Sequence, residues 1–144
     1  MSDLDLRNAA AAGDADAVLA ALKAGAGVNA RGEYGDTALN LAAENGHDGV
    51  VSVLLGAGAD IENLGGADKT PLMNAAFAGH VGIVRRLLAR GARISDDLLS
   101  SLQTKVSILE ENAEGGMVRP EAAESWRTFL DAMIAERRKQ DGGS

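Results

Sequence analysis

The two histidines of the chain, His47 and His80, are the side chains best suited to bind a metal ion or to transfer a proton. They lie 33 residues apart, so they occupy equivalent places if the chain repeats with that period. Packed helices lie about 8–10 Å apart, whereas zinc requires each ligand nitrogen within about 2.0–2.1 Å. We therefore predict that both histidines are structural and that each imidazole hydrogen-bonds to the backbone at a turn between two helices.

Other reactive residue types do not form a catalytic arrangement. A Ser-His-Asp site needs a serine beside a histidine, but Ser52 lies five residues beyond His47 on an expected helix and faces away. The Gly65–Gly66 pair lacks the lysine and hydroxyl residue of a phosphate-binding loop. Adjacent carboxylates on a helix point in different directions, and such pairs occur at Asp14 with Asp16, Asp96 with Asp97, and Glu110 with Glu111. The sequence predicts no catalytic residue, no metal site and no cofactor, and therefore a protein that is not an enzyme.

The elements that carry these residues are copies of one unit. The segment Thr37–His47 aligns with Thr70–His80 at an offset of 33 residues. The same offset relates Gly13, Gly46 and Gly79; Gly25, Gly58 and Gly91; and Leu22, Leu55 and Leu88. A fixed period of this length predicts a solenoid of stacked supersecondary units.

Each unit has the pattern of two short helices. Thr70 is a helix-capping residue, Pro71 suits the first helical position, and Gly79 suits a helix end that needs left-handed backbone. The second helix has a wide apolar stripe, formed by Ile83, Val84, Leu87 and Leu88 in one unit and Val50, Val51, Leu54 and Leu55 in the unit before it. Helices this short are marginal alone, so they must be stabilised by the neighbouring units.

These landmarks resemble the ankyrin-repeat family: Thr70-Pro71-Leu72, the Ala-Ala pair, Gly-His, the paired aliphatic residues and Gly-Ala-Asp. The resemblance covers roughly Leu4 to Ile94 and implies an all-α solenoid of stacked antiparallel helix pairs with hairpin-like loops. The chain departs from the pattern at Asn40 and Met73, where the family commonly has histidine. It also departs at Asp68, where a hairpin glycine is common.

The repeat pattern breaks after Ile94, and longer helical patterns replace it. One helix is predicted from about Asp96 to Asn112, and Gly115–Gly116 should break it before a second helix from Pro120 to about Lys139. The predicted organisation is ankyrin repeats over 1–94 (4–31, 32–64 and 65–94), a divergent fourth repeat or C-terminal capping helices over 95–139, and a disordered tail over 140–144.

Composition narrows the classes of partner. The chain has 144 residues and a net charge of −7, and an acidic surface disfavours nucleic acid as a partner. No apolar run approaches the roughly 20 residues of a membrane span, and Met1–Asp5 lacks the features of a secretory signal. We therefore expect a cytoplasmic protein. We also expect an aliphatic core, because aromatic residues make up only 3% of the chain.

The resemblance also implies where a partner protein would bind. In the family, partners contact the loop tips and the exposed side of each unit's first helix, which form the concave face. The corresponding residues are Arg31, Glu33, Tyr34, Asp36, Glu44, Asn45, Lys69 and Phe77. Tyr34 and Phe77 are the main candidates, because aromatic side chains are favoured interface anchors. The predicted function is a monomeric, non-enzymatic protein–protein interaction module that acts as a regulator or inhibitor.

A second hypothesis is a self-assembling structural subunit. The last predicted helix has a broad apolar face, formed by Trp126, Phe129, Met133 and Ile134 among others. If that face is larger than the third repeat can cover, a dimer formed through the C-terminal helices would bury it.

Overall fold

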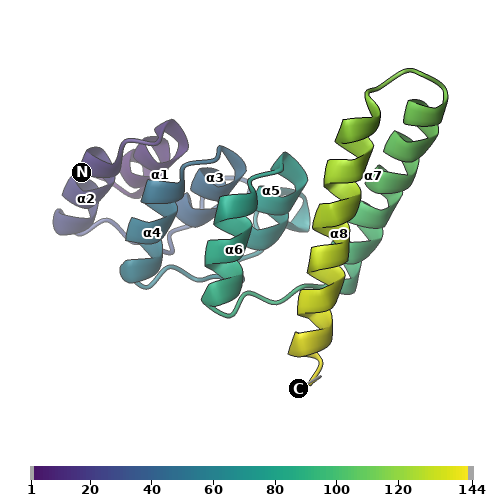
Figure 1. The fold of residues 1–144 in the computed structure, drawn as a ribbon. Helices are drawn as coiled ribbons and strands as arrows, with labels where there is room; N and C mark the ends of the chain where they lie inside the picture. Colours follow the sequence, from purple (N-terminus) through teal and green to yellow (C-terminus); the bar gives the residue numbers. More distant parts are fainter. Residues whose placement is uncertain (1, 143–144) are drawn as a thin grey trace. The chain divides into compact units, whose positions relative to one another are not determined.

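The computed structural model describes residues 2–142, and this part of the chain is all-helical (Figure 1). Its elements are α1 (Asp3–Ala12), α2 (Ala15–Lys23), α3 (Ala38–Glu44), α4 (Asp48–Gly56), the 3₁₀ turn η1 (Gly66–Asp68), α5 (Pro71–Ala78), α6 (Val81–Ala89), α7 (Asp96–Glu114) and α8 (Pro120–Gln140). The chain divides into two compact units: the repeat unit, which ends at Ala92, and the hairpin unit, which begins at Arg93. None of the described helices has the length and apolarity needed to cross a membrane.

The repeat unit contains three antiparallel helix pairs, α1–α2, α3–α4 and α5–α6, stacked in sequence order (Figure 1). The first helices form one row, because α3 packs against both α1 and α5. The second helices form another row, in which α4 packs against α2 and α6. This arrangement confirms the predicted all-α solenoid.

Local sequence fixes the helix boundaries. Thr70 is the N-cap of α5 and its Oγ1 accepts a hydrogen bond from the Met73 N–H at 3.2 Å, while Pro71 occupies the first helical position. Gly79 ends that helix in the left-handed region, with φ 81°. These observations confirm the predicted helix start and the predicted glycine stop.

Tight loops join one helix pair to the next. The Gly32 N–H donates to the Asp36 carbonyl and the Gly65 N–H donates to the Lys69 carbonyl, both at 2.9 Å. Asp68 has φ 56°, so it adopts the left-handed conformation that its place in the glycine pattern requires. The loops are therefore equivalent turns even though their sequences differ.

The core of the repeat unit is aliphatic. Its fully buried leucines lie on α1, α3, α4, α5 and α6, at Leu6, Leu39, Leu54, Leu72 and Leu87. The N-terminal pair is less well covered, because Leu4 is 56% exposed and Leu19 is 44% exposed. The first repeat therefore buries less apolar surface than the repeats that follow it.

The hairpin unit consists of α7 and α8, which pack against each other. Its buried positions are Leu98, Leu102 and Val106 on α7 and Ala123, Leu130 and Met133 on α8. The predicted break lies at Gly115, the C-cap of α7, and at Gly116, which has φ 76°. Both helices were thus expected in the right places, and α7 extends to Glu114 rather than Asn112.

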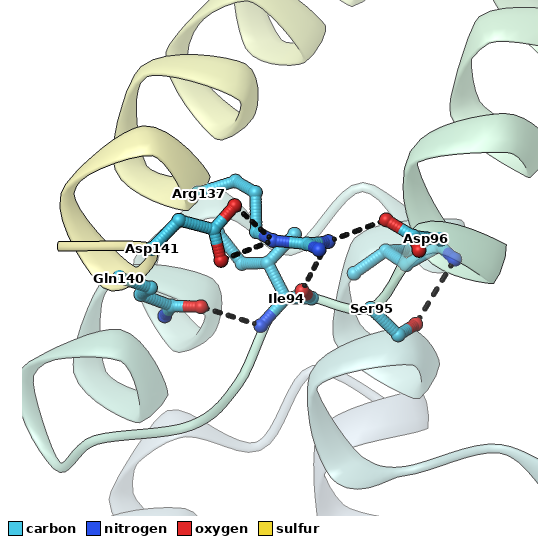
Figure 2. Close-up of polar contacts among 7 residues, drawn as sticks. Ile94, Ser95, Asp96, Arg137, Gln140 and Asp141 are labelled. Carbon is cyan, nitrogen blue, oxygen red and sulfur yellow. Dashed lines mark hydrogen bonds and ion pairs between the residues drawn. The ribbon is translucent and has the colours of Figure 1, made fainter. Parts of the chain in front are cut away.

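Polar side chains close the open end of this hairpin (Figure 2). The Ile94 N–H donates to Gln140 Oε1 at 2.8 Å, and Arg137 Nη1 donates to the Ile94 carbonyl at 2.9 Å. Arg137 also forms ion pairs with Asp96 at 2.8 Å and Asp141 at 3.0 Å. Gln140, the first residue of the tail expected over 140–144, is the last residue of α8, and residues 143–144 lie outside the described part of the chain.

Candidate functional site

The tips of neighbouring loops in the repeat unit are joined by side-chain hydrogen bonds to the backbone. Arg31 donates to two carbonyls, from Nε to Gly35 at 3.2 Å and from Nη2 to Leu64 at 2.9 Å. Asp36 Oδ1 accepts from the Gly66 N–H at 2.9 Å. Sequence reasoning predicted Arg31 and Asp36 as partner contacts, and the structure shows that both hold the loops in place.

A buried asparagine lies beneath these loops. Asn40 is 0% exposed, and its Oδ1 accepts from the Thr37 N–H at 3.0 Å and from Asn63 Nδ2 at 2.8 Å. Its Nδ2 donates to the Lys69 carbonyl at 3.2 Å and to Asn74 Oδ1 at 2.9 Å. One amide therefore connects the start of α3, the loop between α4 and α5, and α5 itself, which fixes the backbone that presents the loop tips.

The loop tips present apolar side chains to solvent. Tyr34 is 78% exposed and Leu64 is 50% exposed. The two come from adjacent loops, since a Cβ built on Gly66 would lie 3.8 Å from Tyr34 Cβ. Glu33 is exposed beside Tyr34. Leu64 was not among the predicted site residues, although a large aliphatic residue in a glycine-rich loop could have indicated it.

The remaining predicted residues lie on or beside the first helices of the second and third pairs. Lys69 Nζ lies 5.5 Å from the centroid of the Phe77 ring, a cation–π contact, and both residues are half-buried. Glu44 and Asn45 are exposed at the end of α3. Asn45 Nδ2 donates back to the Leu41 carbonyl at 2.9 Å. The structure thus forms two groups: the loop-tip group of Glu33, Tyr34 and Leu64, and the helix group of Glu44, Asn45, Lys69 and Phe77.

The histidines connect one repeat to the next. His47 Nε2 donates to the Ala11 carbonyl and His80 Nε2 donates to the Glu44 carbonyl, each at 3.0 Å. The expected backbone hydrogen bond is present, and its acceptor belongs to the preceding helix pair. Within residues 2–142, no group of three or more histidine, aspartate or glutamate side chains is placed to hold a metal ion.

Ion pairs shift pKa values elsewhere in the chain. The Arg86 guanidinium on α6 binds both carboxylate oxygens of Asp48 on α4, at 2.8 and 3.0 Å, and holds the pKa of that carboxyl below its usual value. In the hairpin unit, Arg127 lowers the pKa of Glu110 in the same way. Both arrangements join neighbouring helices, which is a structural role.

Short antiparallel helix pairs that stack in register, with a tight loop between pairs, define a helical repeat protein. A model of ankyrin repeats in three copies matches residues 6–97, more than half of the chain, so the chain belongs to the ankyrin-repeat family. A comparison with curated proteins gave no match. Members of the family are generally protein–protein interaction modules without enzymatic activity.

Proposed function

We propose that this chain captures a partner protein with the loop-tip group and the helix group of its repeat unit. The observation that carries the proposal is Tyr34, a large aromatic side chain that is 78% exposed on a loop with a fixed backbone. Aromatic side chains are enriched at the centres of protein interfaces, where their burial stabilises the complex. Tyr34 and Phe77 are proposed as anchors, and Leu64 is proposed as the apolar neighbour of Tyr34.

The fixed loops support binding for a second reason. Ordering a flexible loop on association costs conformational entropy, and a loop that is already ordered avoids that cost. Arg31, Asp36 and Asn40 supply this order through bonds to the loop backbone. They are proposed as positioning residues, whereas Glu33, Glu44, Asn45 and Lys69 are proposed as polar contacts around the anchors.

The mode of action follows from the chemistry of the surface. Binding alone changes a partner by covering part of its surface, so we propose a regulator or inhibitor of that partner. The net charge of −7 favours protein over nucleic acid as the partner class.

The test is recovery of partners from a native extract by wild-type protein and by a Tyr34→Ala/Phe77→Ala variant, followed by measurement of affinity for the recovered protein. We expect a loss of at least about 2 kcal/mol in binding free energy, as for interface hot spots. Leu19→Ala is the matched control, because Leu19 is also an exposed apolar residue but lies on α2. Equal affinity of the double variant and the wild type would reject this surface.

Self-assembly through the C-terminal helices is the alternative. Trp126 already has partners within one hairpin: its ring is T-shaped to Phe129 at 5.7 Å, and Lys105 Nζ lies 3.9 Å from its centroid. These contacts favour a monomer as the binding-competent form. Light scattering at several protein concentrations separates the two hypotheses, because only self-assembly predicts a mass that rises with concentration.

A further inference from the structure

The loop between α7 and α8 exposes a methionine, Met117, although the helix cap to which it belongs usually places such a residue against the helix. The Met117 N–H donates to the Asn112 carbonyl at 2.8 Å, and Gly116 between them has φ 76°. This is the hydrogen bond of a Schellman cap, in which the residue at the Met117 position commonly makes an apolar contact with the helix. Here the facing residue is Asn112, and Met117 is 79% exposed.

A second apolar side chain lies nearby. Ile108 is 52% exposed and precedes Asn112 by four residues on α7, so the two share one side of the helix. Ile108 and Met117 therefore flank Asn112 at the end of the hairpin. Methionine suits surfaces that adapt to a partner, because its side chain is unbranched and polarisable.

The charges around these residues destabilise the C-terminal end of α7. Glu111 and Glu114 are exposed in the last turn of α7, where there is no basic residue. Negative charge at a helix C-terminus is unfavourable, because the backbone dipole is negative there. Arg127 pairs with Glu110 at 3.0 Å, and no ion pair to Glu111 or Glu114 is found within residues 2–142.

The α8 side of the loop is acidic as well. Glu121 and Glu124 are both exposed on its first turns. Residues 108–124 thus contain five acidic side chains against one basic side chain, Arg119. Local rules of helix electrostatics are typically broken at sites that serve function.

From these observations we propose that residues 108–124 form a docking surface for a cationic amphipathic segment of a partner protein. Lysine or arginine side chains of that segment pair with Glu111, Glu114 and Glu124, and its apolar face covers Ile108 and Met117. Complementary charge selects this class of partner, because an acidic rim repels nucleic acid and anionic lipid surfaces. The proposal is independent of the surface assigned to the repeat unit.

The probe is a synthetic peptide of lysine, leucine and alanine arranged as an amphipathic helix. Its counterpart has glutamate in place of lysine. Binding to the full chain is measured by fluorescence anisotropy of the labelled peptide over a range of salt concentrations. We expect the lysine peptide to bind, its affinity to fall as salt rises, and the glutamate peptide not to bind.

Variants locate the binding site on the chain. Glu111→Gln/Glu114→Gln/Glu124→Gln is expected to weaken lysine-peptide binding by about tenfold or more at low salt and to flatten its salt dependence, since three exposed ion pairs are lost. The same variant should melt at an equal or higher temperature than the wild type, because unfavourable charge leaves the end of α7. Met117→Ser is expected to weaken binding several-fold while its salt dependence is unchanged.

The control is Asp16→Asn/Asp68→Asn in the repeat unit, two exposed carboxylates outside both proposed surfaces, and it should bind the lysine peptide as the wild type does. Three results would overturn the proposal: no binding of the lysine peptide, equal binding of the triple variant with its melting transition intact, or a loss confined to the repeat-unit control. The thermal melt of each variant separates weaker binding from loss of the folded state.

Discussion

The repeat unit and the hairpin unit differ in how their polar contacts recur along the chain. In the repeat unit, side chains of one helix pair bond to the backbone of another, as His47 does to the Ala11 carbonyl and Arg31 to the Leu64 carbonyl. The hairpin unit relies on one apolar seam, on an ion pair between Arg127 and Glu110, and on the polar closure around Ile94. The histidine bond recurs at the equivalent place in the next repeat, from His80 to the Glu44 carbonyl, whereas each polar contact of the hairpin unit is specific to one place in the chain.

This difference explains why each unit suits its proposed role. Side-chain bonds to backbone hold the loops of the repeat unit in one conformation, which favours a preformed binding surface. The hairpin unit has its described polar closure at the end near Ile94, and its opposite end carries exposed apolar and acidic residues. Variants that remove one kind of contact at a time test the comparison.

The largest effect is expected from the apolar core of the repeat unit. Leu54 is 0% exposed on the middle helix pair, so Leu54→Ala removes contacts with the neighbours on which each short helix depends. We expect a loss of about 4 kcal/mol in the free energy of unfolding, measured by urea denaturation. Leu19→Ala, at a position that is 44% exposed, should cost less than about 1 kcal/mol. Similar losses for the two variants would show that burial in the middle repeat does not control stability.

The next effect comes from the buried amide of Asn40. Asn40→Ala leaves the Lys69 carbonyl and the Asn63 and Asn74 amides without their bonds to this side chain. Unpaired buried polar groups are costly, and we expect a loss of about 3 kcal/mol. Asn45→Ala is the matched control, because Asn45 is exposed and bonds only within its own helix. Hydrogen exchange should also quicken at the Gly66 amide in Asn40→Ala and stay unchanged in the control.

Most of the fold follows from the sequence because its causes are local. The caps at Thr70 and Gly79 and the left-handed glycines each act within one or two turns of backbone, and the 33-residue period shows where these local signals recur. The hydrogen-bond partners of the Asn40 side chain could not be predicted from such local signals. Its four partners come from the N-cap of α3, the loop between α4 and α5, and α5 itself, so its role depends on how two repeats pack.

The candidate site was less accessible to sequence reasoning. Tyr34 and Glu33 were chosen by type and place, and both are exposed. Arg31 and Asp36 are predicted as partner contacts on the same grounds, but the sequence does not show that they also hold the loops. The backbone groups that they bond lie about a full repeat further along the chain, at Leu64 and Gly66. The exposure of Met117 could not be predicted either, because an apolar residue at this position of a Schellman cap usually packs onto its own helix.

A smaller effect separates backbone strain from contact between repeats. Gly46 and Gly58 both have positive φ, at 79° and 91°. A Cβ at Gly46 would lie 2.7 Å from His80 Cε1, whereas a Cβ at Gly58 would meet nothing within 4 Å. Gly58→Ala should cost about 1 kcal/mol from strain alone. Gly46→Ala should cost about 1 kcal/mol more, because the displaced His80 loses its bond to the Glu44 carbonyl.

Thermal unfolding of the two glycine variants measures the difference. A matched control is Gly46→Ala in a His80→Ala background, where the steric contact is absent. In that background the cost of Gly46→Ala should fall to the cost of Gly58→Ala. If it does not fall, the histidine contact contributes nothing to the requirement for glycine, and the repeats are joined through other bonds.

The smallest effect is expected from the ion pair between α4 and α6, and it depends on pH. The Arg86 guanidinium lowers the pKa of Asp48 below its ordinary value of 3.8. Stability from this pair is therefore fully present above that ordinary value and is lost as the pH falls through the lower folded-state pKa. Asp48→Asn should slightly lower the melting temperature at pH 7 and have a progressively smaller effect as the pH falls, because protonation of Asp48 in the wild type removes the ion pair. Both side chains are substantially exposed, at 51% and 41%, so added salt should reduce the difference at pH 7. A difference between the two proteins that stays constant as the pH falls would assign the stabilisation to packing of the Asp48 side chain rather than to its charge.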